Sequence, residues 1–314
     1  MSGIGLVYNP RAGGNRRDPG VPARLARRLG DHGVVAVPRS LDELARTAED
    51  FERQKISVLG IAGGDGTNHV TLTGFNAVYG AKPLPTVALL RGGTMNTVAN
   101  SLGLPKGKPE GLLDRLVRRY VAEPRLESFE RPMMRIDGKL GFLFGTGVIP
   151  GYLKEYYATG SPSSWTAMKT LALACGSAAV SGAMIKRMTA PVEAEVTVDG
   201  QTWERRSFIT IAAGTIPDIG LGFHLFHRAT ERDDALHLIG IHASAFGCVV
   251  DLPRIFRALP MSAGKAIDAL TTRATITSLD GGPIAYTIDG DLLERRDGRV
   301  TLGVGPRVRI ATMK

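Results

Sequence analysis

The sequence predicts a chain of two parts: an α/β N-terminal domain with a parallel sheet covered by helices on both faces, and a β-rich antiparallel sandwich as the C-terminal domain. Three observations predict this fold class. Apolar runs of strand length alternate with helical runs up to about residue 125, Asp-Gly turns separate strand-like runs after it, and 314 residues can bury two cores. We expect a first domain over residues 1–127 and a second over 128–314, with an extreme C-terminus that can return to the first.

The first domain is predicted as a series of βαβ units. Its strands are expected at 3–10, 33–40, 55–64 and 84–93, and its helices at 21–30, 41–54, 67–80 and 114–125. A parallel sheet of this kind binds its ligands beyond the carboxyl ends of its strands. The segments that follow those strands are therefore where a site is expected.

The second domain is predicted from its turns. Asp-Gly pairs, which favour hairpins, stand at 137–138, 199–200, 289–290 and 297–298. The segment 164–188 differs, because it is helical in period and rich in Ala, Gly and Ser. It is interpreted as a helix packed closely on the sandwich, or as the lid or wall of a site for an apolar substrate. The junction near residues 124–130 is expected to be short.

Composition indicates a globular protein with anionic partners. The net charge of +9 favours a nucleotide and an anionic membrane surface as partners. The arginines of the predicted helices at 21–30 and 114–125 are interpreted first as a solvated face, and otherwise as a face attracted to an anionic membrane. Nucleic acid is not expected, since aromatic residues make up only 6% and no base-stacking motif is present. The start of the chain lacks the features of a signal peptide, no apolar run is long enough for a membrane span, and two cysteines cannot form a disulfide framework. A cytoplasmic protein is expected, with peripheral association to the inner face of the membrane.

Three polar, glycine-rich segments follow predicted strands: NPRAGG at 9–14, GGDGTN at 63–68 and RGGTMN at 91–96. Each alone could be an ordinary tight turn. Together, at one edge of a parallel sheet, they are expected to converge on an anion, with glycines that let the backbone approach a phosphate. Asp65 stands in the second segment, on what is interpreted as a solvent-facing loop, where an acid beside phosphate requires Mg²⁺ or a transferring proton.

These segments also carry a resemblance. VYNPRAGG, GGDGTNHV and GTMNTVANSLGLP, in this order and at this spacing, resemble the motifs of the diacylglycerol kinase catalytic-domain family, whose bacterial branch of soluble lipid kinases is related to sphingosine and ceramide kinases and has an NAD kinase-like fold. The resemblance implies a two-domain kinase with ATP in the cleft between the domains and a lipid alcohol as acceptor. The nucleotide contacts that it implies are Asn9, Pro10, Arg11, Ala12, Gly13, Ser40, Gly63, Gly64, Asp65, Gly66, Thr67, Asn68, Thr94 and Asn96. Thr97 departs from the family, which usually has an acid there.

The resemblance extends to two pieces of the second half. The segment GLGFHLFHRATERDDALHLIGI resembles one that binds a structural Mg²⁺, so the resemblance implies a metal held by the Asp233 carboxylate and the carbonyls of Thr230 and Ala235. His237 stands where the family has a second Asp. Zinc is not expected at the nearby histidines, because Cys partners are missing.

The other piece is YTIDGDLLE, where the family has Asp-Gly-Glu with the last acid as general base. Here the residues are Asp289, Gly290 and Asp291, so Asp291 or Asp289 is expected to take the proton of the acceptor hydroxyl, with Asp65 serving the metal or the hydroxyl. A plain hairpin turn is the alternative reading of this stretch.

The function that these motifs favour is transfer of the γ-phosphoryl group of ATP, with Mg²⁺, to a lipid alcohol. Diacylglycerol is the first candidate acceptor, followed by a sphingoid base or ceramide. Two alternatives stay open: an NAD kinase, which shares GGDGT but pairs it with an Asn-Glu dipeptide not found here, and a nucleotide-binding regulatory protein without activity.

Overall fold

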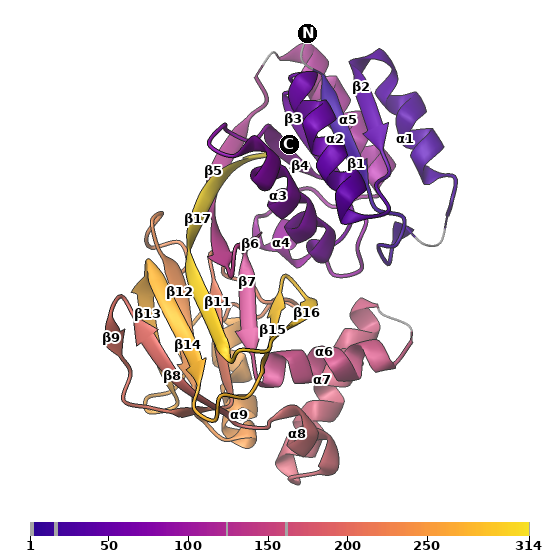
Figure 1. Ribbon diagram of the computed structural model, residues 1–314. Coiled ribbons are helices and arrows are strands. Elements are labelled where there is room, and N and C mark those ends of the chain that lie inside the picture. Colours follow the sequence, from indigo (N-terminus) through magenta and orange to yellow (C-terminus); the bar gives the residue numbers. More distant parts are fainter. Residues whose placement is uncertain (1–2, 16–17, 124, 161–162, 314) are drawn as a thin grey trace. The chain divides into compact units, whose positions relative to one another are not determined.

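The computed structural model describes residues 3–15, 18–123, 125–160 and 163–313. The chain divides into two compact units, one of Met1–Arg131 with Arg307–Lys314 and the other of Pro132–Pro306 (Figure 1). Pro124, at the start of the expected junction, lies outside the described residues.

The first unit is an α/β fold around a parallel sheet of order β4-β3-β1-β2. Its elements are β1 (Ile4–Tyr8), α1 (Val21–Leu29), the 3₁₀ helix η2 (Gly30–His32), β2 (Gly33–Ala36), α2 (Leu41–Arg53), β3 (Val58–Ala62), α3 (Asp65–Tyr79), β4 (Thr86–Leu89), α4 (Thr97–Ser101) and α5 (Pro109–Ala122). The predicted alternation of strands and helices is confirmed.

Helices cover both faces of this sheet. One hydrophobic core joins α1 and α5 to the strands, with Leu25 and Leu113 fully buried against Ile4 and Leu6 of β1. On α2 and α3, Phe51 and Phe75 meet edge to face with ring centroids 5.8 Å apart. Phe51 lies directly over Gly5 of β1, where any side chain would overlap its ring. The sheet is therefore buried on both sides, as parallel sheets usually are.

The second unit is built from two antiparallel sheets. One has the order β13-β12-β11-β7-β15-β16, and the other contains β10-β8-β14-β17, with β9 beside β8, β5 beside β17 and β6 beside β5. The strands are β5 (Ser128–Ile136), β6 (Lys139–Gly141), β7 (Leu143–Thr146), β8 (Val192–Val198), β9 (Gln201–Thr202), β10 (Ser207–Phe208), β11 (Thr210–Gly214), β12 (Leu236–Ile241), β13 (Ala266–Thr271), β14 (Arg273–Ser278), β15 (Ile284–Ile288), β16 (Asp291–Arg295) and β17 (Arg299–Ala311). β17 pairs with β14 and then, through Ile310, with Val87 of β4.

Side chains of both sheets form one core, which makes this unit the predicted β-sandwich. Val196 and Ile276 from one sheet and Phe144, Leu238 and Ile288 from the other are all buried in it. The fold class expected from the sequence, α/β followed by an antiparallel sandwich, is confirmed.

Three of the four Asp-Gly pairs predicted as hairpin turns do form hairpins, joining β5 to β6, β8 to β9 and β15 to β16. In each, both turn residues have positive φ, for example 47° at Asp289 and 89° at Gly290, as a two-residue type I′ turn requires. The prediction for 297–298 is wrong, because this turn joins β16 to β17, which belong to different sheets. An Asp-Gly pair favours a turn at its own position, whereas side-chain packing in the core determines which strands pair.

Four helices of the second unit are α6 (Val148–Ala158), α7 (Ser164–Ala179), α8 (Ala183–Met188) and α9 (Ala245–Phe256). Residues 164–188 were expected to form one helical segment, and α6 and α9 were not predicted from the sequence. The segment breaks because Ser181 has a φ of 50°, which right-handed helix excludes. The Ser177 hydroxyl then accepts the N–H of Ile185 at 3.0 Å, which supports the start of α8.

Asp251 of α9 holds the chain that follows this helix. Its carboxylate accepts hydrogen bonds from Lys265 Nζ at 2.9 Å and from the backbone N–H and the hydroxyl of Ser262, both at 2.8 Å. Burial raises its pKa, but these hydrogen bonds outweigh burial and hold the pKa below the ordinary 3.8. The carboxylate therefore contributes stability above pH 3.8 that is lost as the pH falls through its lower folded-state pKa.

We expect Asp251→Asn to lower the free energy of unfolding by about 1–3 kcal/mol at neutral pH, since it leaves hydrogen-bond donors unpaired. The difference from the parent should shrink below about pH 4, where the parent loses the same ionised group. Urea unfolding at both pH values measures it. An equal difference at the two would contradict the assigned pKa direction.

Candidate functional site

The strand order of the first unit places a switch point between β1 and β3. From these two neighbouring strands the chain continues outward in opposite directions, to β2 beyond β1 and to β4 beyond β3. In open α/β sheets the ligand crevice lies at such a point, outside the carboxyl ends of the strands. The segments 9–14 and 63–68 follow β1 and β3 directly, and 91–96 follows β4. The three predicted segments thus lie at one edge of the sheet.

Hydrogen bonds join the first segment to the second. The backbone N–H of Asn9 donates to the Ala62 carbonyl at 3.1 Å, and Asn9 Nδ2 donates to the Thr67 hydroxyl at 2.8 Å. Asn15, only 4% exposed, donates from Nδ2 to the carbonyls of Asn9 and Ala62. Asn15 was not predicted from the sequence, although its position one residue after the motif was a usable signal.

The glycines allow the three segments to touch. A Cβ on Gly93 would overlap the Cα of Gly64, and a Cβ on Gly13 would overlap the Thr94 hydroxyl. At Gly14, a Cβ would lie 2.8 Å from the Gly92 carbonyl oxygen, which already accepts the Gly14 N–H. The sequence analysis expected these glycines to make room for phosphate. Their first requirement, in this structure, is close contact between loops.

Asp65 connects the second segment to the third. Its Oδ2 accepts the N–H of Thr97 at 2.8 Å and its Oδ1 accepts the N–H of Val98 at 3.0 Å, so the carboxylate caps the N-terminus of α4. The interpretation of Asp65 as part of a solvent-facing loop is wrong: it is the half-buried first residue of α3. Burial raises its pKa, against the lowering effect of the two N–H donors and of Arg91. Each carboxylate oxygen keeps a second lone pair with which it could accept another hydrogen bond.

The third segment is closed by its own side chains. Asn96, in the left-handed region at φ 49°, accepts the N–H of Gly93 and donates to its carbonyl. Arg91, also at positive φ, donates to the Leu104 carbonyl at 2.6 Å and to Asn100 Oδ1 at 2.6 Å. The side-chain amide of Asn96 therefore stabilises its own loop. The hydroxyl of Thr94, which is half-buried, lies beside Gly13 of the first segment. Arg91 was quoted in the motif but not singled out.

The start of α3 adds hydrogen-bond donors to the same edge. The first-turn N–H groups of Gly66 and Thr67 have no partner within the helix, because its first backbone bond is the one from Asn68 to Gly64. Such N–H groups and the helix dipole favour a phosphate. Ser40 lies after β2 and caps α2, where its hydroxyl accepts the N–H of Glu43 at 3.1 Å. Pro10, Arg11 and Ala12 belong to the first segment.

The second unit holds the other predicted acids at the turn from β15 to β16. Asp289 is 4% exposed, and its Oδ1 accepts the N–H groups of Phe142 and Leu143 at 3.0 and 2.8 Å. Asp137 and Asp199, in the other two hairpin turns, likewise accept backbone N–H groups of a neighbouring strand. Asp289 thus has the contacts of a turn-anchoring residue. Asp291 begins β16 and is half-exposed.

The predicted metal residues lie on the turn before β12. Thr230 and Asp233 are exposed and Ala235 is buried, while the neighbouring Asp234 is held by Arg232 through two hydrogen bonds of 2.9 Å. Within the described residues no group of three or more His, Cys, Asp and Glu side chains could hold a metal. One carboxylate and two carbonyls still suit Mg²⁺, which usually keeps several waters. The Mg²⁺ assignment stays a prediction.

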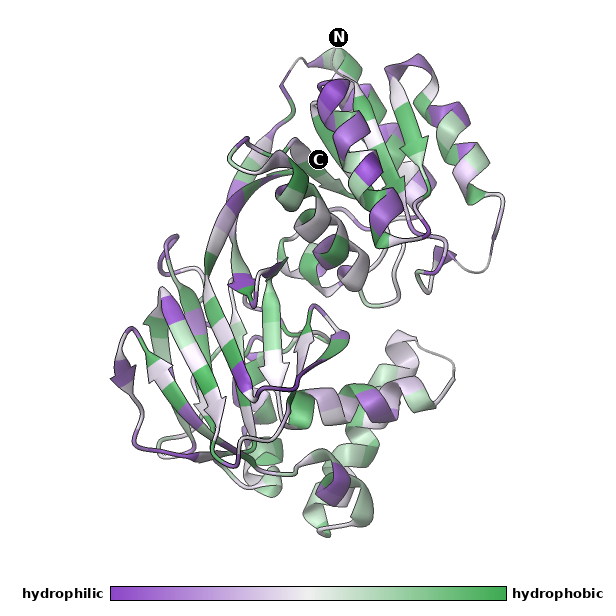
Figure 2. Ribbon diagram, in the orientation of Figure 1, coloured by the Kyte–Doolittle hydropathy of each residue, from purple (hydrophilic) through white to green (hydrophobic). Residues whose placement is uncertain are grey.

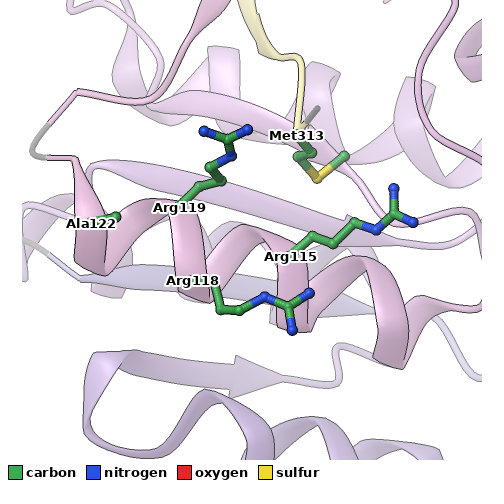
Figure 3. A pocket seen from close by; sticks show the side chains of 5 residues that line it. All are labelled: Arg115, Arg118, Arg119, Ala122 and Met313. Carbon is green, nitrogen blue, oxygen red and sulfur yellow. The ribbon is translucent and has the colours of Figure 1, made fainter.

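A pocket of about 400 Å³ lies outside the three segments. Figure 3 shows its lining of three arginines from α5 with Ala122 and Met313. Arg115, Arg118 and Arg119 favour an anion there, with an attraction that salt screens because the side chains are exposed.

Three glycine-rich segments thus lie at one edge of the parallel sheet in the α/β unit, and residues 3–126 match the family model of the diacylglycerol kinase catalytic domain. This match bears out, over these residues, the resemblance that the three motifs carry. A crystal structure of a diacylglycerol kinase from Bacillus anthracis str. Sterne is similar, with a TM-score of 0.66 and 14% identity over 99% of this chain and 97% of that one. Two further structures from the same organism have TM-scores of 0.68 and 0.69 at 14% and 15% identity.

These structural similarities show the fold over the whole chain. No curated protein gives a significant match. Each helix in the described part of the chain is too short or too polar to cross a membrane.

The contact between the second and third segments gives a direct test of the glycine arrangement. We expect Gly93→Ala to weaken ATP binding at least about tenfold and to lower the unfolding temperature, because the new methyl group overlaps backbone that cannot move aside. Gly111→Ala is the matched control: Gly111 lies in α5 with nothing within 4 Å of the added carbon, so this variant should be as stable as the parent or slightly more. Calorimetric titration with ATP and thermal unfolding measure both effects, and equal behaviour of the two variants would contradict the loop contact.

Proposed function

We propose that this protein is an ATP-dependent lipid kinase, which transfers the γ-phosphoryl group of ATP to the hydroxyl of a lipid alcohol. Diacylglycerol is the first candidate acceptor, and a sphingoid base or ceramide is the next. The observation that supports the proposal most directly is the meeting of three glycine-rich segments at the switch point of the parallel sheet, within residues that match a kinase catalytic domain. The protein would act in the cytoplasm, at the inner face of the membrane.

The residues at the switch point would bind the nucleotide. The N–H groups of Gly66 and Thr67, in the first turn of α3, would donate to phosphate oxygens, together with Asn9, whose side chain bonds the Thr67 hydroxyl, and Arg11 of the first segment. Asp65 holds α4 against this edge and so orients the third segment. Mg²⁺, when bound, would neutralise charge on the phosphates.

The proton of the acceptor hydroxyl needs a carboxylate to receive it as the new P–O bond forms. We assign this role to Asp291 and a positioning role to Asp289. The contacts support the division: Asp289 is buried and accepts two backbone N–H groups, whereas Asp291 is half-exposed at the start of β16. The Tyr157 hydroxyl donates to the Gly290 carbonyl at 3.2 Å, which adds a tether from α6 to the same turn.

Transfer of labelled phosphate from ATP to a panel of acceptors tests the proposal. The panel contains diacylglycerol, a sphingoid base, ceramide and NAD, each with Mg²⁺. Label in one lipid product is expected, and the Gly93→Ala variant should lose it. Label in NAD instead would make the protein an NAD kinase, and ATP binding with no labelled product from any acceptor would make it a regulatory protein; either result would overturn the proposal.

A further inference from the structure

The helix α7 buries small side chains and exposes large apolar ones, which is the reverse of the usual arrangement. Its buried side is formed by small residues, namely Ala167, Thr170, Ala174 and Ala178. Its larger apolar side chains are exposed: Trp165 is 74% exposed, Leu173 is 56% exposed, and Met168 is similarly uncovered. A helix that packs on its own protein normally buries its large apolar residues and exposes polar ones. The described residues of its own unit therefore leave the apolar face of α7 uncovered.

The neighbouring helix α9 continues the exposed apolar surface. The two helices contact each other, and Phe246, Val250 and Phe256 of α9 are each more than half exposed. Figure 2 shows α9 largely in green and α7 in pale green tones, whereas purple and green alternate along α1 and α2 of the other unit. We call the exposed apolar side chains of α7 and α9 the α7–α9 surface.

The exposed charged side chains of α7, of α9 and of the segments that follow them are cations. Between Glu155 and Glu193 the sequence contains no acid, while Lys169 and Lys186 are exposed there. Along α9 and the loop after it the one acid is Asp251, which is buried against Lys265, and Arg254 and Arg257 are exposed. Apolar side chains with a Trp among them, surrounded by cations, are typical of surfaces that lie in the interface of an anionic bilayer.

We propose that the α7–α9 surface docks this protein onto an anionic lipid bilayer, with Trp165, Met168 and Leu173 inserted among the lipids. Burial of the exposed side chains would drive insertion, and each nearby cation would add attraction to the leaflet. The surface differs from the arginine-rich faces of α1 and α5, which the sequence alone suggested for membrane contact. Docking goes beyond the proposed kinase activity and is measured without it.

Tryptophan fluorescence tests insertion. The chain has two Trp residues, and Trp203 packs against Phe208 with ring centroids 6.1 Å apart, so Trp203→Phe leaves the exposed Trp165 as the reporter. Vesicles of equimolar phosphatidylglycerol and phosphatidylcholine should shift its emission to shorter wavelength. Vesicles of phosphatidylcholine alone should shift it much less. Emission that does not change with the anionic vesicles would overturn the proposal.

Co-sedimentation with the same vesicles tests which side chains bind. The double variant Trp165→Ser, Leu173→Ser should bind at least about tenfold more weakly than the parent, because it removes two inserted apolar side chains. Val121→Ser is the matched control, since Val121 is 60% exposed on α5, outside the surface, and its loss should leave binding unchanged. Lys169→Glu, Lys186→Glu should weaken binding and reduce its dependence on salt.

Three results would overturn the proposal: parental binding by the Trp165→Ser, Leu173→Ser variant, an equal loss in Val121→Ser, or a parent that is dimeric without lipid while the double variant is monomeric by light scattering. The last would mean that a second copy of the chain covers the surface. Because the substituted side chains are exposed, the unfolding temperature should stay near that of the parent, which separates lost binding from lost folding. A docked protein without labelled product would contradict the kinase proposal alone.

Discussion

Asp291→Asn should lower turnover at least about a hundredfold and leave ATP affinity nearly unchanged, the usual scale for loss of a general base. The amide cannot take the proton of the acceptor hydroxyl, yet it has almost the same volume at a half-exposed position, so the fold should be retained. Initial rates with labelled ATP and calorimetric titration with ATP measure the two effects. Asp297→Asn is the control. Asp297 lies in the turn after β16, is exposed, and forms an ion pair with Arg295. A loss below tenfold, or an equal loss in the control, would remove Asp291 from the mechanism.

A second variant at position 291, Asp291→Glu, tests whether the length of the acidic side chain matters. Asp is one methylene shorter than Glu, so its carboxylate reaches about 1.5 Å less far, and a misplacement of about 1 Å can cost on the order of a hundredfold in rate. If the site is built for the short acid, Asp291→Glu should not raise the rate. If Asp291→Glu instead raises the turnover rate tenfold or more, the natural protein is a kinase weakened by its shorter acid.

Asp289 should respond differently from Asp291. Asp289→Asn removes charge from an anchor that accepts two backbone N–H groups, so we expect a lower unfolding temperature, as for the equivalent anchor variant Asp137→Asn. Asp291→Asn should change the unfolding temperature little. This difference separates the positioning residue from the catalytic one.

Asp65→Asn is expected to abolish measurable turnover. The amide has one acceptor oxygen where the carboxylate has two, so one of the N–H groups of Thr97 and Val98 loses its partner and the third segment is no longer held at both points. The substitution also removes the negative charge that a metal or a proton would need. Turnover within tenfold of the parent would rule out both roles.

The change in folding stability caused by Asp65→Asn should depend on pH. Burial raises the pKa of Asp65 in the folded protein above its ordinary value, so folding favours the protonated acid, and the stability that this contributes is lost as the pH rises through the folded-state pKa. The Asn side chain does not titrate. The stability difference between parent and Asp65→Asn should therefore be smaller at neutral pH than near about pH 4, as urea unfolding at both values would show. A larger difference at neutral pH would contradict the raised pKa.

Much of the fold could be predicted because its signals are local. A buried strand such as Val58–Ala62 is an uninterrupted apolar run, and a type I′ turn such as Asp289-Gly290 needs two residues that tolerate positive φ. Glycine clusters after strands mark places where the backbone is approached closely. These features depend on neighbours along the chain, so the two-part architecture and the three segments of the candidate site were readable without coordinates.

The groups that lie against these glycines could not be predicted from local sequence. The sequence suggested a phosphate, and the structure places Gly64 against Gly93 and Gly13 against Thr94. Asn15, which bonds the carbonyl of Asn9 in the first segment and that of Ala62 at the end of β3, was missed for the same reason. Contacts of this kind join residues far apart in the chain, and no local pattern records them.

By itself, the sequence determined the class of fold, the alternation of strands and helices in the first domain, and the three loops that resemble those of a kinase family, because propensity, periodicity and turn chemistry act between near neighbours. Only the tertiary structure decided that Asp65 caps α4, that the turn at 297–298 joins two sheets, and that α7 turns its large apolar side chains outward. The physical reason is that a carboxylate bonds whichever N–H groups packing brings to it, and a helix face is buried or exposed according to what lies over it. Both depend on the assembled core.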